Sequence, residues 1–273
     1  MSESGVWLDT AQVEGPQGRV FVRLMHRNSG AADTTALLFL HPANLSGLCW
    51  MGVAERMRDV LCVLIDSRGH GRSHTNGPFG IDDYAADVIA VVEAVELRAI
   101  HLVGASLGGS VACAVAAAIP GAVQSLTALG ASLEPADPES LAALAEWRAT
   151  GATAELFDAF LAQEVRHGLP VGIADDARRQ VDLDARGSAL IKEVTWNAFA
   201  EDGRRYARHI HCPALVLTGE HDASCPQGAG ARMAAALGAP FEILPGLGHF
   251  PMMQAPALVA DRLSRFIHGV ALP

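Results

Sequence analysis

The sequence is poor in basic residues and lacks the features of an export signal. Twenty Lys and Arg residues stand against 30 Asp and Glu residues, which gives a net charge of −10. A nucleic-acid partner needs a basic surface that can release counterions, so this balance argues against one. The first ten residues contain neither the basic stretch nor the apolar stretch of a signal peptide, which predicts a cytoplasmic protein.

Charged residues are also missing from one long internal stretch, residues 99–123. The stretch contains four glycines, two serines, a histidine and a proline, which a lipid-facing helix disfavours. We therefore expect no membrane span, and we expect this apolar segment to be buried in the protein core.

Cysteines are few, and their spacing excludes common zinc sites. The five are Cys49, Cys62, Cys113, Cys212 and Cys225, an odd number with no C-x-x-C pair. Reduced thiols and no metal site are therefore expected.

The composition predicts a folded globular protein with a large core. Half of the 273 residues are hydrophobic and 18% are charged. This length suits one large domain, or one domain with an inserted subdomain.

Apolar strand-like runs alternate with helical patterns along the chain, which predicts a mostly parallel, doubly wound α/β sheet. Strands are expected at 6–10, 19–26, 36–40, 60–65, 100–103, 123–129, 214–218 and 240–244. Helices are expected at 46–58, 81–97, 138–150, 153–167, 227–237 and 256–268. Strand runs are absent from 133–209, which predicts a helical cap inserted into a core formed by 1–132 and 210–273.

A G-x-S-x-G motif, Gly104 to Gly108, follows an apolar strand run and precedes an Ala-rich helical segment that stops at Pro120. This context predicts a nucleophile elbow, in which a sharp strand-to-helix turn exposes the Ser106 hydroxyl. The glycines let strand and helix approach without Cβ clashes.

A serine nucleophile needs a base, and the base needs a third group that fixes its tautomer. Ligands of such sheets bind beyond the carboxyl ends of the strands. Asp222 and His249 each follow a predicted strand, so Ser106, Asp222 and His249 are the expected catalytic triad. Because the triad supplies its own base, we expect no metal or organic cofactor.

These motifs resemble those of the α/β-hydrolase superfamily over nearly the whole chain outside the insertion. The order nucleophile, acid, base is the order of that fold. The family usually has His-Gly where this chain has His41-Pro42. The matching pieces are His41-Pro42, Asp66-x-Arg68-Gly69-His70-Gly71-x-Ser73, Gly104 to Gly109, Cys212-Pro213-Ala214, Gly219-Glu220-His221-Asp222 and Gly248-His249-Phe250.

The resemblance also implies two backbone donors for an oxyanion hole. The N–H of Leu107, after the nucleophile, supplies one, and the loop after the third strand supplies the other. Proline has no N–H, so the second donor falls on Ala43. We expect substrate contacts from Asn44, Trp147, Trp196 and Phe250.

A serine at the elbow favours acyl chemistry over the carboxylate-nucleophile relatives. The motifs resemble the 3-oxoadipate enol-lactone hydrolase and small bacterial carboxylesterase branch, which implies a small or medium ester or lactone as the small-molecule acyl substrate. Two alternatives share the triad: a carbon–carbon bond hydrolase of ring-cleavage products and a cofactor-free perhydrolase. A catalytically slow ligand-binding or receptor protein is an alternative of another class. The sequence leaves the natural substrate, the chain length, the pathway and homo-oligomer formation open.

Overall fold

The computed structural model describes residues 7–26, 35–57, 59–181 and 186–269. The predicted start of the first strand at residue 6 and the predicted helix end at residue 58 lie outside this part of the chain. So do residues 182–185 of the predicted insertion, and residues 1–6, 27–34 and 270–273 of the predicted core.

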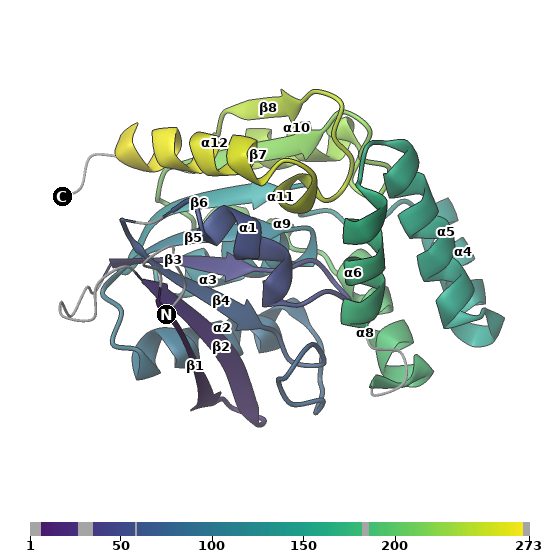
Figure 1. The fold of residues 1–273 in the computed structure, drawn as a ribbon, viewed down its shortest axis with the longest axis horizontal. Coiled ribbons are helices and arrows are strands. Elements are labelled where there is room, and N and C mark those ends of the chain that lie inside the picture. The colour runs from purple at the N-terminus through teal and green to yellow at the C-terminus, as the bar shows by residue number, and fades with distance from the viewer. Residues whose placement is uncertain (1–6, 27–34, 58, 182–185, 270–273) are drawn as a thin grey trace.

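Within the described residues, eight strands form one sheet in the order β1-β2-β4-β3-β5-β6-β7-β8 (Figure 1). The pairs β1–β2 and β2–β4 are antiparallel and the remaining pairs are parallel, which confirms the predicted fold class. The strands are β1 (Trp7–Glu14), β2 (Arg19–His26), β3 (Thr35–Leu40), β4 (Leu61–Asp66), β5 (Ala99–Ala105), β6 (Val123–Leu129), β7 (Ala214–Gly219) and β8 (Phe241–Leu244).

The central strands are largely apolar because both faces of the sheet are covered. Leu38 and Leu40 of β3 point into one core, and Leu37 and Phe39 point into the other. The first core is closed by α2 (Ile81–Ala94), α3 (Leu107–Ala118), α9 (Arg204–Ala207) and α10 (Gln227–Leu237). The second is closed by η1 (Gly47–Trp50), α1 (Met51–Ala54), α11 (Pro251–Gln254) and α12 (Pro256–Gly269).

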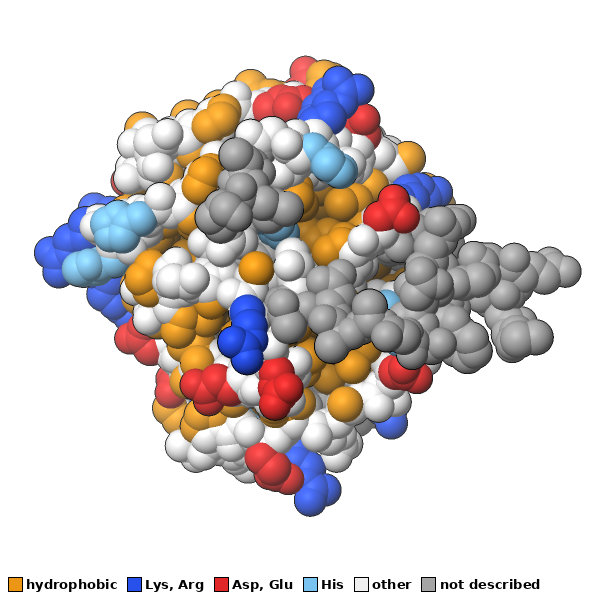
Figure 2. All heavy atoms as spheres, turned by 90° about the vertical axis from the view of Figure 1, so that its left-hand side faces the viewer, with side chains coloured by type: hydrophobic (Ala, Val, Ile, Leu, Met, Phe, Trp, Pro, Cys, Tyr) orange, Lys and Arg blue, Asp and Glu red, His pale blue; other side chains and the backbone are white. Residues whose placement is uncertain are grey.

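Further helices stand between β6 and β7 in the sequence and gather at the carboxyl ends of the parallel strands (Figure 1). They are α4 (Pro138–Thr150), α5 (Thr153–Arg166), α6 (Val171–Val181) and α8 (Ser188–Ala200). The opposite side of the molecule shows charged side chains of both signs among small hydrophobic areas (Figure 2).

The predicted helix at 46–58 is wrong in its form. The structure has a 3-10 turn, η1, followed by the single turn of α1. Tertiary hydrogen bonds hold its start, since the Gly47 N–H donates to the Asp66 carboxylate at 2.9 Å. Several large apolar side chains of this segment are buried: Trp50, Val53 and Met57 are at most 8% exposed.

Candidate active site

Ser106 lies between β5 and α3 with φ 52° and ψ −121°, a backbone conformation that residues other than glycine rarely adopt. The surrounding glycines permit it. A Cβ on Gly104 would lie 2.1 Å from the Gly108 carbonyl oxygen, and a Cβ on Gly108 would lie 2.3 Å from the Leu40 carbonyl oxygen. The chain therefore makes the tight strand-to-helix turn that the motif predicts, and the N-terminus of α3 is drawn against the end of β3.

Asp222 and His249 form a buried pair after β7 and β8. His249 Nδ1 lies 2.9 Å from both carboxylate oxygens of Asp222, and each residue is 5% exposed. Backbone N–H groups of Ser224 and Cys225 also donate to Asp222 Oδ1, at 3.0 and 2.8 Å. These bonds hold the carboxylate in one orientation, and the carboxylate fixes the tautomer of the imidazole.

Opposing effects act on the pKa of His249. Burial lowers it, but the negative charge of Asp222 and the hydrogen bond to it, together with the charge of Glu164, outweigh burial. The net result is a pKa above the ordinary value of 6.5. A base of this kind is stabilised once it has accepted a proton.

Gly130, directly after β6, is a site residue that the sequence reasoning missed. It has φ +50°, and a Cβ there would lie 2.6 Å from Asp222 Oδ2 and 3.3 Å from His249 Nδ1. A glycine directly after a buried apolar strand was the available signal. Because glycine has no Cβ, the space next to it can hold the hydrogen-bonded Asp222 carboxylate and His249 imidazole.

The loop after β3 is fixed by His41. Its Nδ1–H donates to the Pro42 carbonyl at 2.7 Å, and its Nε2 accepts the Ser67 N–H at 2.9 Å. Burial lowers the pKa of His41 to about 4, which suits this neutral tautomer. The Leu45 N–H donates to the same Pro42 carbonyl at 3.3 Å, so the backbone around Ala43 is held in a turn.

Asp66 anchors several segments beneath the site. Its fully buried carboxylate accepts hydrogen bonds from Arg23 at 2.7 Å, from the Gly47 N–H at 2.9 Å and from the Arg72 N–H at 3.0 Å. The carboxylate therefore braces the loop after β4 and links it to β2 and to η1.

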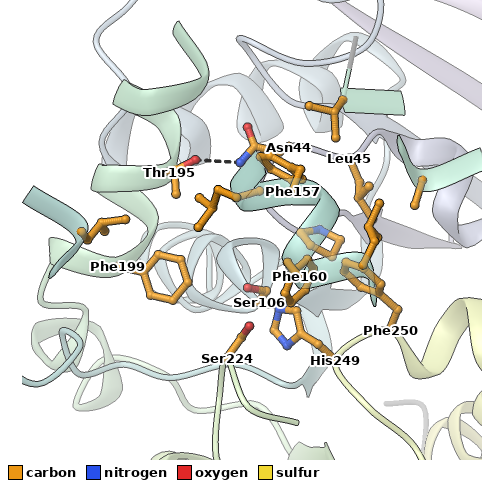
Figure 3. Close-up of a pocket in the computed structure, with 17 residues that line it drawn as sticks. Asn44, Leu45, Ser106, Phe157, Phe160, Thr195, Phe199, Ser224, His249 and Phe250 are labelled. Atoms are coloured by element: carbon orange, nitrogen blue, oxygen red, sulfur yellow. Dashed lines mark hydrogen bonds between the residues drawn. The ribbon is translucent and has the colours of Figure 1, made fainter. Parts of the chain in front are cut away.

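Ser106 and His249 line the same cavity, whose volume is about 230 Å³. Figure 3 shows the Ser106 side chain beside the His249 ring, with aromatic rings from the inserted helices above them. The aromatic residues in the walls of this cavity are Phe157, Phe160, Phe199 and Phe250. An apolar cavity with a few converging polar groups is the usual form of a small-molecule site.

A second cavity, of about 350 Å³, meets the first at Ser106, Phe199 and Ser224. Its walls carry the acidic side chains Glu134, Asp137 and Glu201 and the basic side chain Arg232. Arg232 forms an ion pair with Glu134 at 2.7 Å. The serine thus lies where an apolar space joins a polar one.

Two of the four predicted substrate-contact residues, Asn44 and Phe250, line the apolar cavity. Asn44 turns its amide toward the insertion, where Nδ2 donates to Thr195 Oγ1 at 2.8 Å (Figure 3). Its Oδ1 accepts a hydrogen bond from Arg186 at 3.1 Å. The amide of Asn44 therefore links the insertion to the loop after β3 by hydrogen bonds.

Trp147 and Trp196 are absent from the described residues that line either cavity. They pack between α4 and α8, where Lys192 lies over the Trp147 ring and Arg148 lies over the Trp196 ring. Each ring therefore has a cationic neighbour from the partner helix, and substrate contact by the two tryptophans stays a prediction.

Other wall residues were missed. Their signal was the helical spacing of the inserted segment, in which Phe157, Phe160, Leu161 and Glu164 share the inward side of α5. That spacing identifies a buried face, but it does not say what the face covers.

Among the described residues, no cluster of His, Cys, Asp and Glu side chains is arranged to hold a metal ion. In the same part of the chain, no helix has the length and apolarity that a membrane crossing requires.

Residues 37–262 match the Alpha/beta hydrolase family. The chain therefore belongs to this family.

The chain is 36% identical over 99 residues to the non-heme chloroperoxidase of Burkholderia pyrrocinia. This alignment covers 35% of this chain and 36% of the relative. It is 33% identical over 90 residues to 3-oxoadipate enol-lactonase 2 of Acinetobacter baylyi, covering 32% and 34%. Both alignments thus span about a third of the relative's length. The solved enol-lactonase of Burkholderia xenovorans superposes with a TM-score of 0.83 at 20% identity, over 94% of this chain and 100% of that one.

Proposed function

We propose that this protein is a serine hydrolase that cleaves small or medium carboxylic esters or lactones. The observation that carries the proposal is a buried Asp222–His249 pair at a cavity that also holds Ser106, in its strained elbow. A nucleophile, an orienting acid and a base, in this order along the chain, suit acyl transfer.

In the proposed mechanism, Ser106 Oγ attacks the carbonyl carbon while His249 Nε2 takes the hydroxyl proton. Asp222 holds Nδ1, so Nε2 is the ring nitrogen left for this transfer. The C–O bond to the leaving group then breaks, and His249 returns the proton to the leaving oxygen. Water, activated by the same imidazole, hydrolyses the acyl-Ser106 ester and restores the enzyme.

The proposed oxyanion donors are the backbone N–H groups of Leu107 and Ala43. Leu107 opens α3, and the first N–H groups of a helix have no partner within it. Ala43 lies in the turn fixed by His41, and the close approach of Gly108 to Leu40 brings that turn to the α3 N-terminus. Each such donor is worth about 3 kcal/mol to the transition state.

The substrate class follows from the walls of the cavities. The apolar cavity of about 230 Å³ suits a small or medium apolar group. We propose that the insertion, residues 133–209, acts as a cap over the site. Its helices supply Phe157, Phe160 and Phe199 to the walls of this cavity. The similarity to enol-lactonases supports an ester or lactone.

A second candidate, a perhydrolase that uses the same triad, is favoured by the similarity to the non-heme chloroperoxidase. It would transfer the acyl group from Ser106 to hydrogen peroxide instead of water.

A substrate panel tests the proposal and separates the candidates. p-Nitrophenyl acetate and butyrate, a simple lactone and a dienol-type diketone are compared, with and without hydrogen peroxide, on wild type and Ser106→Ala. Ester or lactone turnover that Ser106→Ala abolishes supports the hydrolase. A preference for the diketone would identify a carbon–carbon hydrolase, and peracid formation a perhydrolase. A folded protein that turns over none of them would identify a binding protein.

A further inference from the structure

Glu164 is a buried acidic residue that the mechanism above does not use. It lies near the C-terminal end of α5, on the side where Phe157 and Leu161 are also buried, and its exposed fraction is 0%. Glu155 and Asp158 of the same helix are exposed. A carboxylate is costly at an apolar position unless a specific partner compensates for its lost hydration.

That partner is the backbone that carries His249. Glu164 Oε2 accepts the His249 N–H at 2.8 Å, and the Phe250 N–H also acts on the carboxylate. Oε1 has no hydrogen-bond partner among the described residues. A Cβ on Gly248 would lie 2.3 Å from Oε2, so a glycine before His249 is what allows this approach.

The end of α5 holds the same loop at a further point. Gln254 Oε1 accepts the Gly248 N–H at 2.9 Å, and Gln254 Nε2 donates to the His167 carbonyl at 3.0 Å. Phe160, one turn before Glu164, meets the His249 ring edge to face at 6.0 Å between centroids. The inserted helix therefore contacts both the backbone and the ring of the proposed base.

We propose that Glu164 is a positioning residue: from inserted helix α5 it fixes the backbone of His249 and places a second negative charge near its imidazole. This inference rests on the proposed function, since it assigns His249 as the base. It also makes the position of the insertion part of the assembly of the site, because the base is held at Nδ1 by the core and at its backbone by α5.

The electrostatic part of this role has a defined sign. Burial raises the pKa of Glu164 and the charge of Asp222 adds to the rise, while His249 and the N–H donors oppose it. The charged groups that act on Glu164 are thus His249, after β8, and Asp222, after β7. The Glu164 charge in turn raises the pKa of His249, so its removal lowers that pKa.

The test compares Glu164→Gln and Glu164→Ala with the exposed Glu155→Gln as the matched control. Glutamine keeps an oxygen that accepts the His249 N–H but removes the charge, and alanine removes both. Loss of alignment at a reacting group costs up to about 100-fold, so we expect Glu164→Ala to lower kcat about 10- to 100-fold with little change in KM. Glu164→Gln should restore kcat to within about threefold of wild type, and Glu155→Gln should match wild type.

An NMR titration of the His249 imidazole gives a readout that needs no turnover. We expect a lower His249 pKa in Glu164→Gln and Glu164→Ala than in wild type, and an unchanged pKa in Glu155→Gln. An unshifted His249 pKa together with wild-type kcat in Glu164→Ala would overturn the inference, as would Glu164→Gln being as slow as Glu164→Ala. If wild type hydrolyses nothing while the His249 pKa still moves, the proposed function fails and the placement of Glu164 stands.

Discussion

Replacing Ser106 with glycine should stabilise the protein while it abolishes hydrolysis. Ser106 has φ 52° and ψ −121°, a conformation that costs a residue with a Cβ about 1–3 kcal/mol and that glycine adopts readily. Glycine loses more backbone entropy on folding, which offsets about 0.5–1 kcal/mol of that gain. Taken at their midpoints, these two ranges leave an expected net gain in the free energy of unfolding of about 1 kcal/mol.

The matched control is Ser106→Ala, which loses the same hydroxyl but keeps the Cβ and therefore the strain. Urea unfolding followed by circular dichroism should give Ser106→Gly the higher midpoint at an unchanged slope, with a difference in the free energy of unfolding of about 1 kcal/mol. Both variants should be inactive. Equal midpoints would refute the reasoning, because they would mean that the backbone strain at residue 106 does not exceed the entropy that glycine loses on folding.

Further predictions concern the acid–base pair and the cavity. Asp222→Asn should lower kcat about 10³- to 10⁴-fold. Because His249 acts as a base only when neutral and Asp222 raises its pKa, kcat/KM of wild type should fall as the pH drops through that raised pKa. In Asp222→Asn this fall should occur at lower pH. Gly130→Ala should lower kcat about 100-fold with the fold intact, because its Cβ would lie 2.6 Å from Asp222 Oδ2; wild-type kcat there would contradict the packing described. Phe157→Ala should enlarge the apolar cavity and raise kcat/KM for hexanoate relative to acetate esters, and an unchanged ratio would place the apolar group of the substrate elsewhere.

The sheet and much of its covering were predictable because local pattern and tertiary position agree there. The uninterrupted apolar run at 36–40 predicts β3, since a strand covered on both faces has no polar side. The helix bounds of α4 and α10 also match: Asp137 caps the first, and Gly238, at φ 62°, ends the second. These signals act within a few residues, so a sequence is enough to read them.

The walls of the site were less predictable because they depend on which helix face meets which loop. Trp147 of α4 and Trp196 of α8, both predicted to contact substrate, each lie beside a cationic side chain of the other helix. Phe157 and Phe199 face the cavity instead. Glu164 was missed because nothing in its local sequence distinguishes it from the exposed Glu155 on the same helix.

The proposed nucleophile can be tested most directly by covalent capture. A fluorophosphonate probe is incubated with wild type, Ser106→Ala and His249→Ala, and the adduct is located by mass spectrometry of proteolytic peptides. We expect one adduct on Ser106 in wild type, none in Ser106→Ala and much slower labelling in His249→Ala. A folded wild-type protein that stays unlabelled, or an adduct on another residue, would contradict it.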